Sequence, residues 1–242
     1  MSDRRVPTAT YRLQLHPGFG FRDASEVVPY LQELGISDLY ASPVLQARTG
    51  SLHGYDVTDP MRVNGELGGD DAFAGLAEAL RARDMGLILD IVPNHMAASH
   101  ENPWWRDVLA RGQESPYAAY FDIDWHPPCG PVDGRLLLPV LGTPYAEALE
   151  RGDLSLSFDD HGLQLRYAEH RFPVHLPGDG GERPLADAVK RSVPRKTSPT
   201  DPSVRAVLDD VLRRCCGPPG DAAAADNLDQ LLSGQCYRLA YW

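Results

Sequence analysis

Along the first ninety positions, segments with a strand-like pattern of polar and apolar side chains alternate with helix-like segments. Residues 8–15 alternate as a half-buried strand does, and the turn-forming run at residues 16–20 stops them. A helix is predicted to begin at Asp23, with apolar side chains recurring on one face at Val27, Val28, Leu31 and Leu34. Gly35 ends this helix just before a second predicted strand at residues 36–41, which makes a β-α-β unit.

A second helix and a third strand continue this alternation. After a polar loop over residues 43–69, a helix opens at Asp70 or Asp71 and leads to an apolar strand over residues 85–92. That strand lacks a two-residue alternation, which is typical of strands covered on both faces. Strands that alternate with helices predict a parallel α/β sheet, and right-handed crossovers leave either a barrel or a doubly wound sheet. Periodicity alone does not choose between these two.

The regular alternation of strands and helices breaks down after a short helix predicted over residues 102–112. Strand-like segments then alternate with Pro- and Gly-rich turns, a pattern that indicates a small β-rich insertion. The predicted strands cover residues 136–141, 154–158 and 163–167, and the clearest turns lie at 127–131 and 177–181. Helices are predicted at residues 203–214 and, as an amphipathic element, at 228–242. We therefore expect a barrel portion at 1–120, an inserted α+β subdomain at 121–227 and a helix returning to the barrel at 228–242.

Polar and aromatic residues gather where each of the three predicted parallel strands ends. Their positions are Gln14 near the end of the first strand, His53, Tyr55 and Asp56 in the loop after the second, and Asp90, Asn94 and His95 at the end of the third. Active sites of (β/α)₈ barrels lie at this carboxyl end of the strands. Sugars combine hydroxyl groups with apolar ring faces, and they need this mixture of aromatic, carboxylate, amide and imidazole groups. The sequence predicts one sugar-binding rim, although Tyr55 as a packing aromatic and Asp56 as an Asx turn are open alternatives.

Composition and charge narrow the range of partners. The 242 residues are 43% hydrophobic and 24% charged, as in an ordinary globular protein, and the net charge of −11 repels phosphate backbones and anionic membranes. We therefore expect no nucleic acid and no membrane as partner. The N-terminal segment lacks the apolar core of a signal peptide and no run could span a bilayer, which predicts a cytoplasmic location.

Cysteine spacing and short motifs argue against several other kinds of site. Cys129, Cys215, Cys216 and Cys236 include no CxxC pair, which favours free thiols; a redox switch at Cys215 and Cys216, beside a basic helix end, is the weaker reading. The histidines near residue 95 lack the HExxH spacing of a zinc site. No complete dinucleotide fingerprint, phosphate-binding loop or GxSxG elbow occurs. We expect no metal and no cofactor.

The segments that carry this candidate chemistry resemble the α-amylase superfamily and, more closely, the maltooligosyltrehalose synthase family. The motif at residues 90–95 is shared across the superfamily, whereas the segments at 8–15 and 237–242 are more particular to the synthases. The other matching segments lie at residues 40–44, 51–60, 100–105, 120–125 and 171–174. The resemblance implies strands one to three of a (β/α)₈ barrel, with a β-rich insertion after the third strand.

The resemblance also implies a reaction and residue roles. These enzymes rearrange the reducing-end α-1,4 linkage of a maltooligosaccharide to an α,α-1,1 linkage, an intramolecular transglucosylation. By resemblance, Tyr55 stacks under the sugar, His95 binds its hydroxyl groups, Asn94 orients the rim, and Asp90 shapes the site. Retaining chemistry needs two carboxyl groups about 5 Å apart, and the family carries them on strands four, five and seven. The resemblance therefore implies that this chain lacks the nucleophile and the acid/base and is inactive alone.

Two alternatives stay open at the level of sequence. One is a fragment of another hydrolase or transglucosylase of the same superfamily. The other is a non-catalytic glucan-binding subunit that completes its barrel with a partner, because a sheet of three barrel strands has exposed edges. A maltooligosaccharide or glucan is the expected ligand in every case, and the rest of the barrel is a candidate partner.

Overall fold

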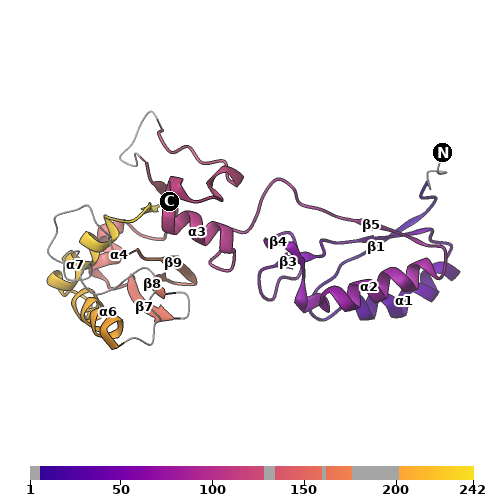
Figure 1. Ribbon diagram of the computed structural model, residues 1–242, viewed down its shortest axis with the longest axis horizontal. Helices are drawn as coiled ribbons and strands as arrows, with labels where there is room; N and C mark the ends of the chain where they lie inside the picture. The colour runs from indigo at the N-terminus through magenta and orange to yellow at the C-terminus, as the bar shows by residue number, and fades with distance from the viewer. Residues whose placement is uncertain (1–5, 128–133, 160–161, 176–201) are drawn as a thin grey trace. The chain divides into compact units, whose positions relative to one another are not determined.

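The computed structural model describes residues 6–127, 134–159, 162–175 and 202–242, and the chain divides into two compact units, Met1–Pro103 and Trp104–Trp242 (Figure 1). The boundary between the units therefore lies earlier than the expected one at residue 120. The reason is that Val108 and Leu109 are buried in the core of the second unit, and Phe121 packs against the same core. The segment after the first unit thus belongs by its packing to the second.

A three-stranded parallel sheet forms the centre of the first unit. Its strand order is β1-β2-β5, and the strands are β1 (Thr10–Leu13), β2 (Asp38–Ala41) and β5 (Gly86–Leu89). Helices α1 (Phe21–Glu33) and α2 (Gly69–Arg81) lie side by side and cover one face of it (Figure 1). Side chains from both helices and from β2 share one buried cluster, among them Val28, Leu76 and Leu39. The predicted α/β alternation is confirmed.

The start of α1 differs from the prediction in detail. Asp23 lies inside the first turn, where its Oδ2 accepts a hydrogen bond from the Gly20 amide at 2.8 Å. Gly20 is required by packing, because a Cβ at this position would lie 2.6 Å from the Leu67 carbonyl oxygen. At the other end, Leu34 follows the last helical residue and is 52% exposed, so it does not belong to the buried face as predicted.

The predicted polar loop at residues 43–69 contains regular structure that the sequence pattern did not indicate. Strands β3 (Leu45–Ala47) and β4 (Val57–Val63) pair in antiparallel fashion with shifts in register, and the 3₁₀ helix η1 (Gly65–Leu67) follows. Ala47 and Val57 are buried and anchor this small sheet. Asn64 caps η1, since its Oδ1 accepts a hydrogen bond from the Glu66 amide at 2.9 Å.

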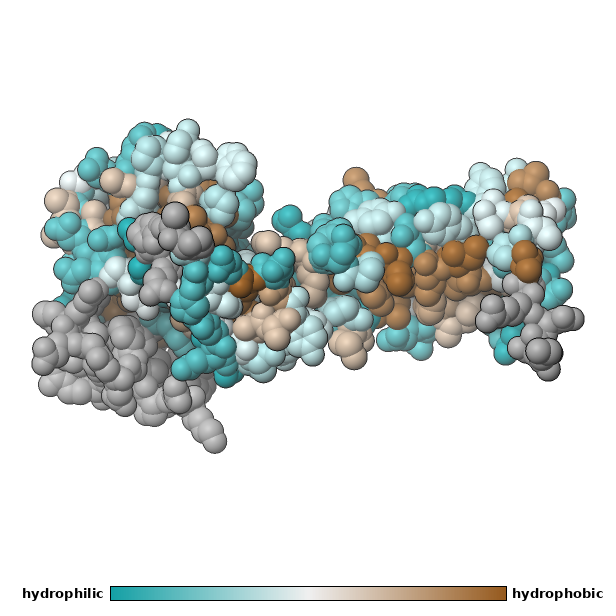
Figure 2. Space-filling view, turned by 90° about the horizontal axis from the view of Figure 1, so that it is seen from above, coloured by the Kyte–Doolittle hydropathy of each residue, from teal (hydrophilic) through white to brown (hydrophobic). Residues whose placement is uncertain are grey.

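The parallel sheet is covered on one face only, among the described residues. Strand β5 was predicted to be buried on both faces, but its residues are only partly buried, and Leu89 is 38% exposed. Ile91, just beyond the strand, is 65% exposed. Figure 2 shows hydrophobic side chains gathered on the surface of this unit. Strands β1 and β5 are the two edges of this three-stranded sheet.

The residues of the second unit that the structure describes form two small sheets. An antiparallel sheet consists of β7 (Ser155–Asp159), β8 (Gly162–Tyr167) and β9 (His170–Pro173), whereas β6 (Leu136–Leu141) pairs in parallel with β10 (Tyr237–Tyr241). The three strands predicted in this region are confirmed. Its described helical elements are α3 (Pro103–Arg111), η2 (Gly112–Glu114), η3 (Ala118–Tyr120), α4 (Tyr145–Glu150), α6 (Pro202–Cys215) and α7 (Ala222–Leu232).

The helix predicted over residues 228–242 is wrong in its second half. Helix α7 ends at Leu232, and the chain continues into strand β10. Within β10, Tyr237 and Leu239 are buried while Arg238 between them is exposed, which is the two-residue period of a strand. Burial against β6 and the core thus determines that this segment forms a strand and not a helix.

Some expectations lie outside the described residues, namely Cys129, residues 128–131 of the turn predicted at 127–131, and the turn predicted at 177–181. Where the structure does describe the chain, no helix combines the length and apolar character needed to cross a bilayer.

Candidate functional site

The uncovered face of the parallel sheet carries polar side chains near the carboxyl ends of its strands. Leu39 and Ala41 of β2 are buried against the helices, so the intervening Tyr40 faces the opposite side. Arg12 is in register with Tyr40 on the neighbouring strand β1. The amide of Asp90 donates to the Ala41 carbonyl at 3.0 Å and continues the ladder between β2 and β5. Strand geometry thus brings Arg12, Tyr40 and Asp90 to one face.

One carboxylate oxygen joins side chains from four segments of the chain. Oδ2 of Asp90 accepts hydrogen bonds from the Tyr55 hydroxyl at 2.5 Å and the Tyr40 hydroxyl at 3.2 Å. Nη2 of Arg12 lies 3.8 Å from the same oxygen. We call Arg12, Tyr40, Tyr55 and Asp90 the Asp90 cluster. The hydrogen bond to Asp90 raises the pKa of Tyr55 above its ordinary value, so the phenol stays protonated and donates.

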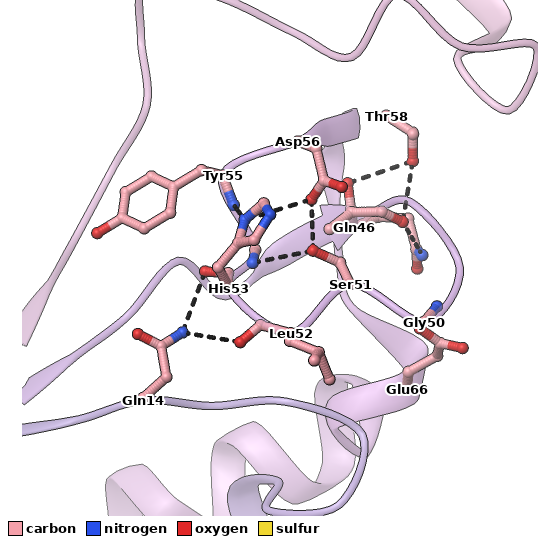
Figure 3. A network of polar contacts seen from close by, with 12 residues as sticks. Gln14, Gln46, Gly50, Ser51, Leu52, His53, Tyr55, Asp56, Thr58 and Glu66 are labelled. Carbon is pink, nitrogen blue, oxygen red and sulfur yellow. Dashed lines mark hydrogen bonds and ion pairs between the residues drawn. The ribbon is translucent and has the colours of Figure 1, made fainter.

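Arg12 also connects the sheet to the loop that carries Tyr55. Its Nη2 donates to the Tyr55 hydroxyl oxygen at 3.1 Å, and its Nη1 donates to Oε1 of Gln14 at 2.8 Å. The bond to Tyr55 is the main cause that raises the pKa of Arg12. Gln14 in turn donates from Nε2 to the carbonyl oxygens of Leu52 and His53, at 3.2 and 3.3 Å (Figure 3). Arg12 of β1 and Gln14, which follows that strand, therefore hold both the loop backbone and the Tyr55 side chain.

Asp56 and His53 shape the loop from within. Ser51 donates from Oγ to Oδ1 of Asp56 at 2.5 Å, and Nδ1 of His53 lies 3.8 Å from the same carboxylate oxygen (Figure 3). His53 Nδ1 also accepts a hydrogen bond from the Tyr55 amide at 3.0 Å. These contacts favour a loop-forming role for Asp56, close to the turn-forming alternative. Figure 3 shows the Tyr55 ring directed away from Asp56.

Gly54 lets the loop make its tight turn. Its φ is +76°, and a Cβ there would lie 2.8 Å from the Pro43 carbonyl oxygen. With this turn, the rings of His53 and Tyr55 stack at a centroid distance of 5.9 Å and an interplanar angle of 29°. The half-buried Tyr55 thus belongs to a small aromatic surface beside the Asp90 carboxylate.

Two glutamates tether the start of the same loop. Oε2 of Glu101 accepts from both the amide and the hydroxyl of Thr49, at 2.8 and 2.7 Å. Oε2 of Glu66 accepts from the Gly50 amide at 2.9 Å. Glu101 follows the segment with Asn94 and His95, so its tether links the regions after β2 and after β5. The sequence held no signal for this pairing, because nothing in the local pattern relates residues 49 and 101.

Asn94 and His95 were predicted to join the rim, but they stand apart from the hydrogen-bonded group. Both side chains are exposed in an irregular segment after β5. Among the interactions between described residues, no hydrogen bond connects either of them to the Asp90 cluster. Of the other predicted residues, Gln14, Tyr55 and Asp90 form one network, and His53 and Asp56 form the adjoining loop.

Arg12 and Tyr40 were not among the site residues predicted from the sequence. A signal for Arg12 did exist, because it lies two residues before Gln14 on a predicted strand and so shares its face. Tyr40 had no comparable signal, since it lies within an apolar strand. Within the described parts of the chain, His, Cys, Asp and Glu residues form no group of three placed to hold a metal ion.

Comparison with known proteins identifies the family. Residues 22–143, just over half of the 242-residue chain, match the family model of the alpha amylase catalytic domain. The chain belongs to the α-amylase family. Three residues of the Asp90 cluster lie within the matched range, namely Tyr40, Tyr55 and Asp90. The match also includes the start of the second unit, residues 104–143.

More specific similarity is to proteins named as maltooligosyltrehalose synthases. A Mycobacterium tuberculosis (strain H37Rv) protein that carries the name maltooligosyl trehalose synthase is 47% identical over 179 residues, 71% of this chain and 22% of that protein. The solved maltooligosyltrehalose synthase of Arthrobacter ramosus is 38% identical, with a TM-score of 0.68, over 98% of this chain and 24% of its own. Another solved maltooligosyl trehalose synthase is 31% identical, with a TM-score of 0.70, over 98% and 26%.

These similarities confirm the predicted resemblance and the α/β fold of this α-amylase family member. They also set its extent, because the chain spans about a fifth to a quarter of the length of these relatives. A chain of this extent resembles only part of each relative.

Proposed function

We propose that this chain is the N-terminal portion of a maltooligosyltrehalose synthase, which rearranges the reducing-end α-1,4 bond of a maltooligosaccharide to an α,α-1,1 bond. The observation that carries the proposal is the reach of the similarity. The general α-amylase model stops at residue 143, within the second unit, whereas solved synthases align with 98% of the chain. Similarity to synthases therefore extends over the unit that the general model leaves largely unmatched.

The proposed architecture is a partial (β/α)₈ barrel. In it, β1, β2 and β5 are barrel strands one to three, and the β-rich region within residues 121–227 is an insertion after strand three. Two observations support this: α1 and α2 cover one face of the sheet, and polar side chains gather on the other face at the carboxyl ends of the strands. The segment from residue 228 onward comprises the end of α7 and strand β10. In the proposed architecture it would lead back towards the barrel.

The proposed substrate is a maltooligosaccharide or a longer glucan. Tyr55 would stack on a glucose ring, since its ring lies beside a carboxylate and its hydroxyl is held by Asp90. Asn94 and His95, which are exposed and follow Asp90 in the sequence, would bind sugar hydroxyl groups. Gln14, His53 and Asp56 would hold the loop, and Asp90 would shape the site. The proposal places the enzyme in the cytoplasm and involves neither a metal nor a cofactor.

In this proposal the 242-residue chain does not catalyse the rearrangement alone. Retaining transfer needs a nucleophile and an acid/base about 5 Å apart. By family resemblance these groups belong to barrel strands four, five and seven, which are not among β1, β2 and β5. The remainder of the barrel is therefore the proposed partner, either on the same polypeptide or as a separate chain.

The test is product analysis on the protein encoded by the complete reading frame that contains this chain. Incubated with maltohexaose, a synthase yields a non-reducing isomer with an α,α-1,1 linkage, visible by NMR, and the reducing-end signals decline. Glucose and shorter maltodextrins would instead identify a hydrolase of the same family. Binding without any turnover would favour the alternative of a non-catalytic glucan-binding subunit.

The role of Tyr55 gives a prediction for the same protein. Tyr55→Ala should weaken maltohexaose binding by about tenfold or more, because the stacking surface is lost. Tyr55→Phe keeps the ring and should retain a larger part of the affinity. Isothermal titration calorimetry measures both. Equal affinities for Tyr55→Ala and the unchanged protein would remove Tyr55 from the binding site.

A further inference from the structure

Arg12 lies where the uncovered face of the sheet meets the loop that carries Tyr55. We propose that Arg12 is a positioning residue that fixes the orientation of the Tyr55 ring for a bound glucan. This inference rests on the proposed function. It assigns a role in glucan binding to Arg12, which was not among the residues of the predicted sugar-binding rim. Its basis is the set of contacts made by one guanidinium group.

The guanidinium group of Arg12 contacts four different side chains. Nη2 donates to the Tyr55 hydroxyl oxygen at 3.1 Å and lies 3.8 Å from Asp90, while Nη1 donates to Gln14 at 2.8 Å. The Cζ atom lies 5.5 Å from the centroid of the Tyr40 ring, in a cation–π arrangement. Arginine suits this position because its donors form a rigid planar fork, whereas lysine offers a single charged point.

The Tyr55 hydroxyl is held from two directions. It donates to the Asp90 carboxylate at 2.5 Å and accepts from Arg12 at 3.1 Å. A hydroxyl fixed by a cation on one side and an anion on the other constrains the ring as well, because the phenol is rigid. Charge-assisted hydrogen bonds are stronger than neutral ones. Arg12 therefore restricts the ring more than Asp90 would alone.

Arg12 also acts on the loop backbone through Gln14. The amide oxygen of Gln14 accepts from Arg12, which leaves the amide nitrogen to donate to the carbonyls of Leu52 and His53. Without Arg12, Gln14 loses the contact that fixes its amide orientation. The same residue thus orients the Tyr55 side chain and steadies the turn that carries it.

A direct sugar contact by Arg12 is the competing role. Its side chain is 38% exposed, so a ligand could reach it. However, Nη1 and Nη2 already donate to protein oxygens at 2.8 and 3.1 Å, and these two bonds hold the guanidinium group in place, so that only its remaining N–H groups are left for a sugar hydroxyl. The geometry favours positioning, and the two roles differ in a measurable way.

A double-mutant cycle separates the two roles. In the protein from the complete reading frame, we compare Arg12→Gln, Tyr55→Phe and the double variant for the Kd of maltohexaose, and for kcat and KM where product forms. Tyr55→Phe keeps the ring but removes the hydroxyl that Arg12 holds. Arg12→Gln should weaken binding about tenfold, and the double variant should be no weaker than the worse single variant. Arg12→Lys should recover part of the loss.

A second measurement does not depend on glucan. Hydrogen exchange of the peptide covering residues 51–56 should become faster in Arg12→Gln, because the loop loses its link to β1. The matched control is Arg22→Gln, an exposed arginine on α1 outside the site, which should change neither exchange in this loop nor affinity. Unchanged exchange in Arg12→Gln would overturn the inference.

The outcomes distinguish this inference from the proposed function. If the effects of Arg12→Gln and Tyr55→Phe on Kd multiply, Arg12 acts independently of Tyr55 and the inference fails while the function stands. If the unchanged protein binds no maltohexaose, the proposed function fails, and the role of Arg12 towards glucan fails with it. Coupled effects on Kd together with faster loop exchange support both.

Discussion

At the scale of single residues, Cys215 and Cys216 show how burial separates two adjacent thiols. Cys215 is buried at the end of α6, and burial raises its pKa to about 11, despite the opposing charge of Arg214. Cys216 is exposed. The basic helix end that could have lowered a thiol pKa is therefore outweighed by desolvation. The two thiols differ too much in environment to act as one reactive pair.

This contrast predicts selective alkylation. Because only the thiolate reacts and the raised pKa keeps Cys215 protonated at pH 8, iodoacetamide should modify Cys216 first and Cys215 much more slowly. Peptide mass spectrometry over a time course measures the order. In guanidinium-unfolded protein, the control, both should react at similar rates. Faster reaction of Cys215 in the folded protein would contradict its burial.

The candidate site shows what a sequence can predict about individual residues. The positions of the strand ends correctly predicted that Gln14, Tyr55 and Asp90 lie close together, because the carboxyl ends of parallel strands meet at one edge of the sheet. Arg12 was missed, although strand periodicity placed it on the same face as Gln14. The role of Glu101 had no local signal, because it depends on a fold that brings residues 49 and 101 together.

At the scale of elements, substitution of glycine by alanine should change the free energy of unfolding in opposite directions at Gly54 and Gly75. Gly54→Ala introduces a side chain at φ +76° and 2.8 Å from a backbone oxygen, so it should lower the free energy of unfolding by about 1–3 kcal/mol. Gly75 lies within α2 with open space around its Cβ position, and Gly75→Ala should stabilise by about 0.5–1 kcal/mol.

Chemical denaturation followed by circular dichroism measures both variants, with m-values compared to exclude a change in cooperativity. Gly54→Ala should also weaken maltohexaose binding, because it displaces the loop with Tyr55, whereas Gly75→Ala should leave binding unchanged. A stabilising Gly54→Ala would mean that the turn is not formed as described.

Most elements followed from the pattern of apolar positions, and the exceptions have physical causes. Helices α1, α2, α3 and α6 and strands β1, β2 and β5 were predicted, because each presents a regular pattern of apolar positions to a core. Strands β3 and β4 were not, since they are short and irregular in register within a polar segment. The segment 237–241 was mistaken for a helix because the helical spacing of Leu228, Leu231 and Leu232 was extended past α7. Pairing with a strand a hundred residues earlier is invisible to a local pattern.

At the scale of the whole molecule, each unit has its own core. One buried cluster contains only residues between Leu15 and Met85, all in the first unit. The other contains only residues between Val108 and Leu239, all in the second unit. No buried residue in the described part of the chain belongs to both clusters, so each cluster is confined to its own unit. Multidomain proteins with separate cores commonly depart from two-state unfolding.

Two separate cores predict two unfolding transitions that respond to different substitutions. Leu39 and Leu165 are each fully buried, one in each core. Leu39→Ala should lower only the Tm of the first unit and Leu165→Ala only that of the second, each by roughly 10 °C or more, since such cavities cost about 2–5 kcal/mol. Differential scanning calorimetry of the 242-residue chain measures both. Leu34→Ala, at a residue 52% exposed, is the control and should shift neither. A single transition lowered equally by Leu39→Ala and Leu165→Ala would mean that the units unfold together, and that contacts between them contribute as much to cooperativity as their separate cores.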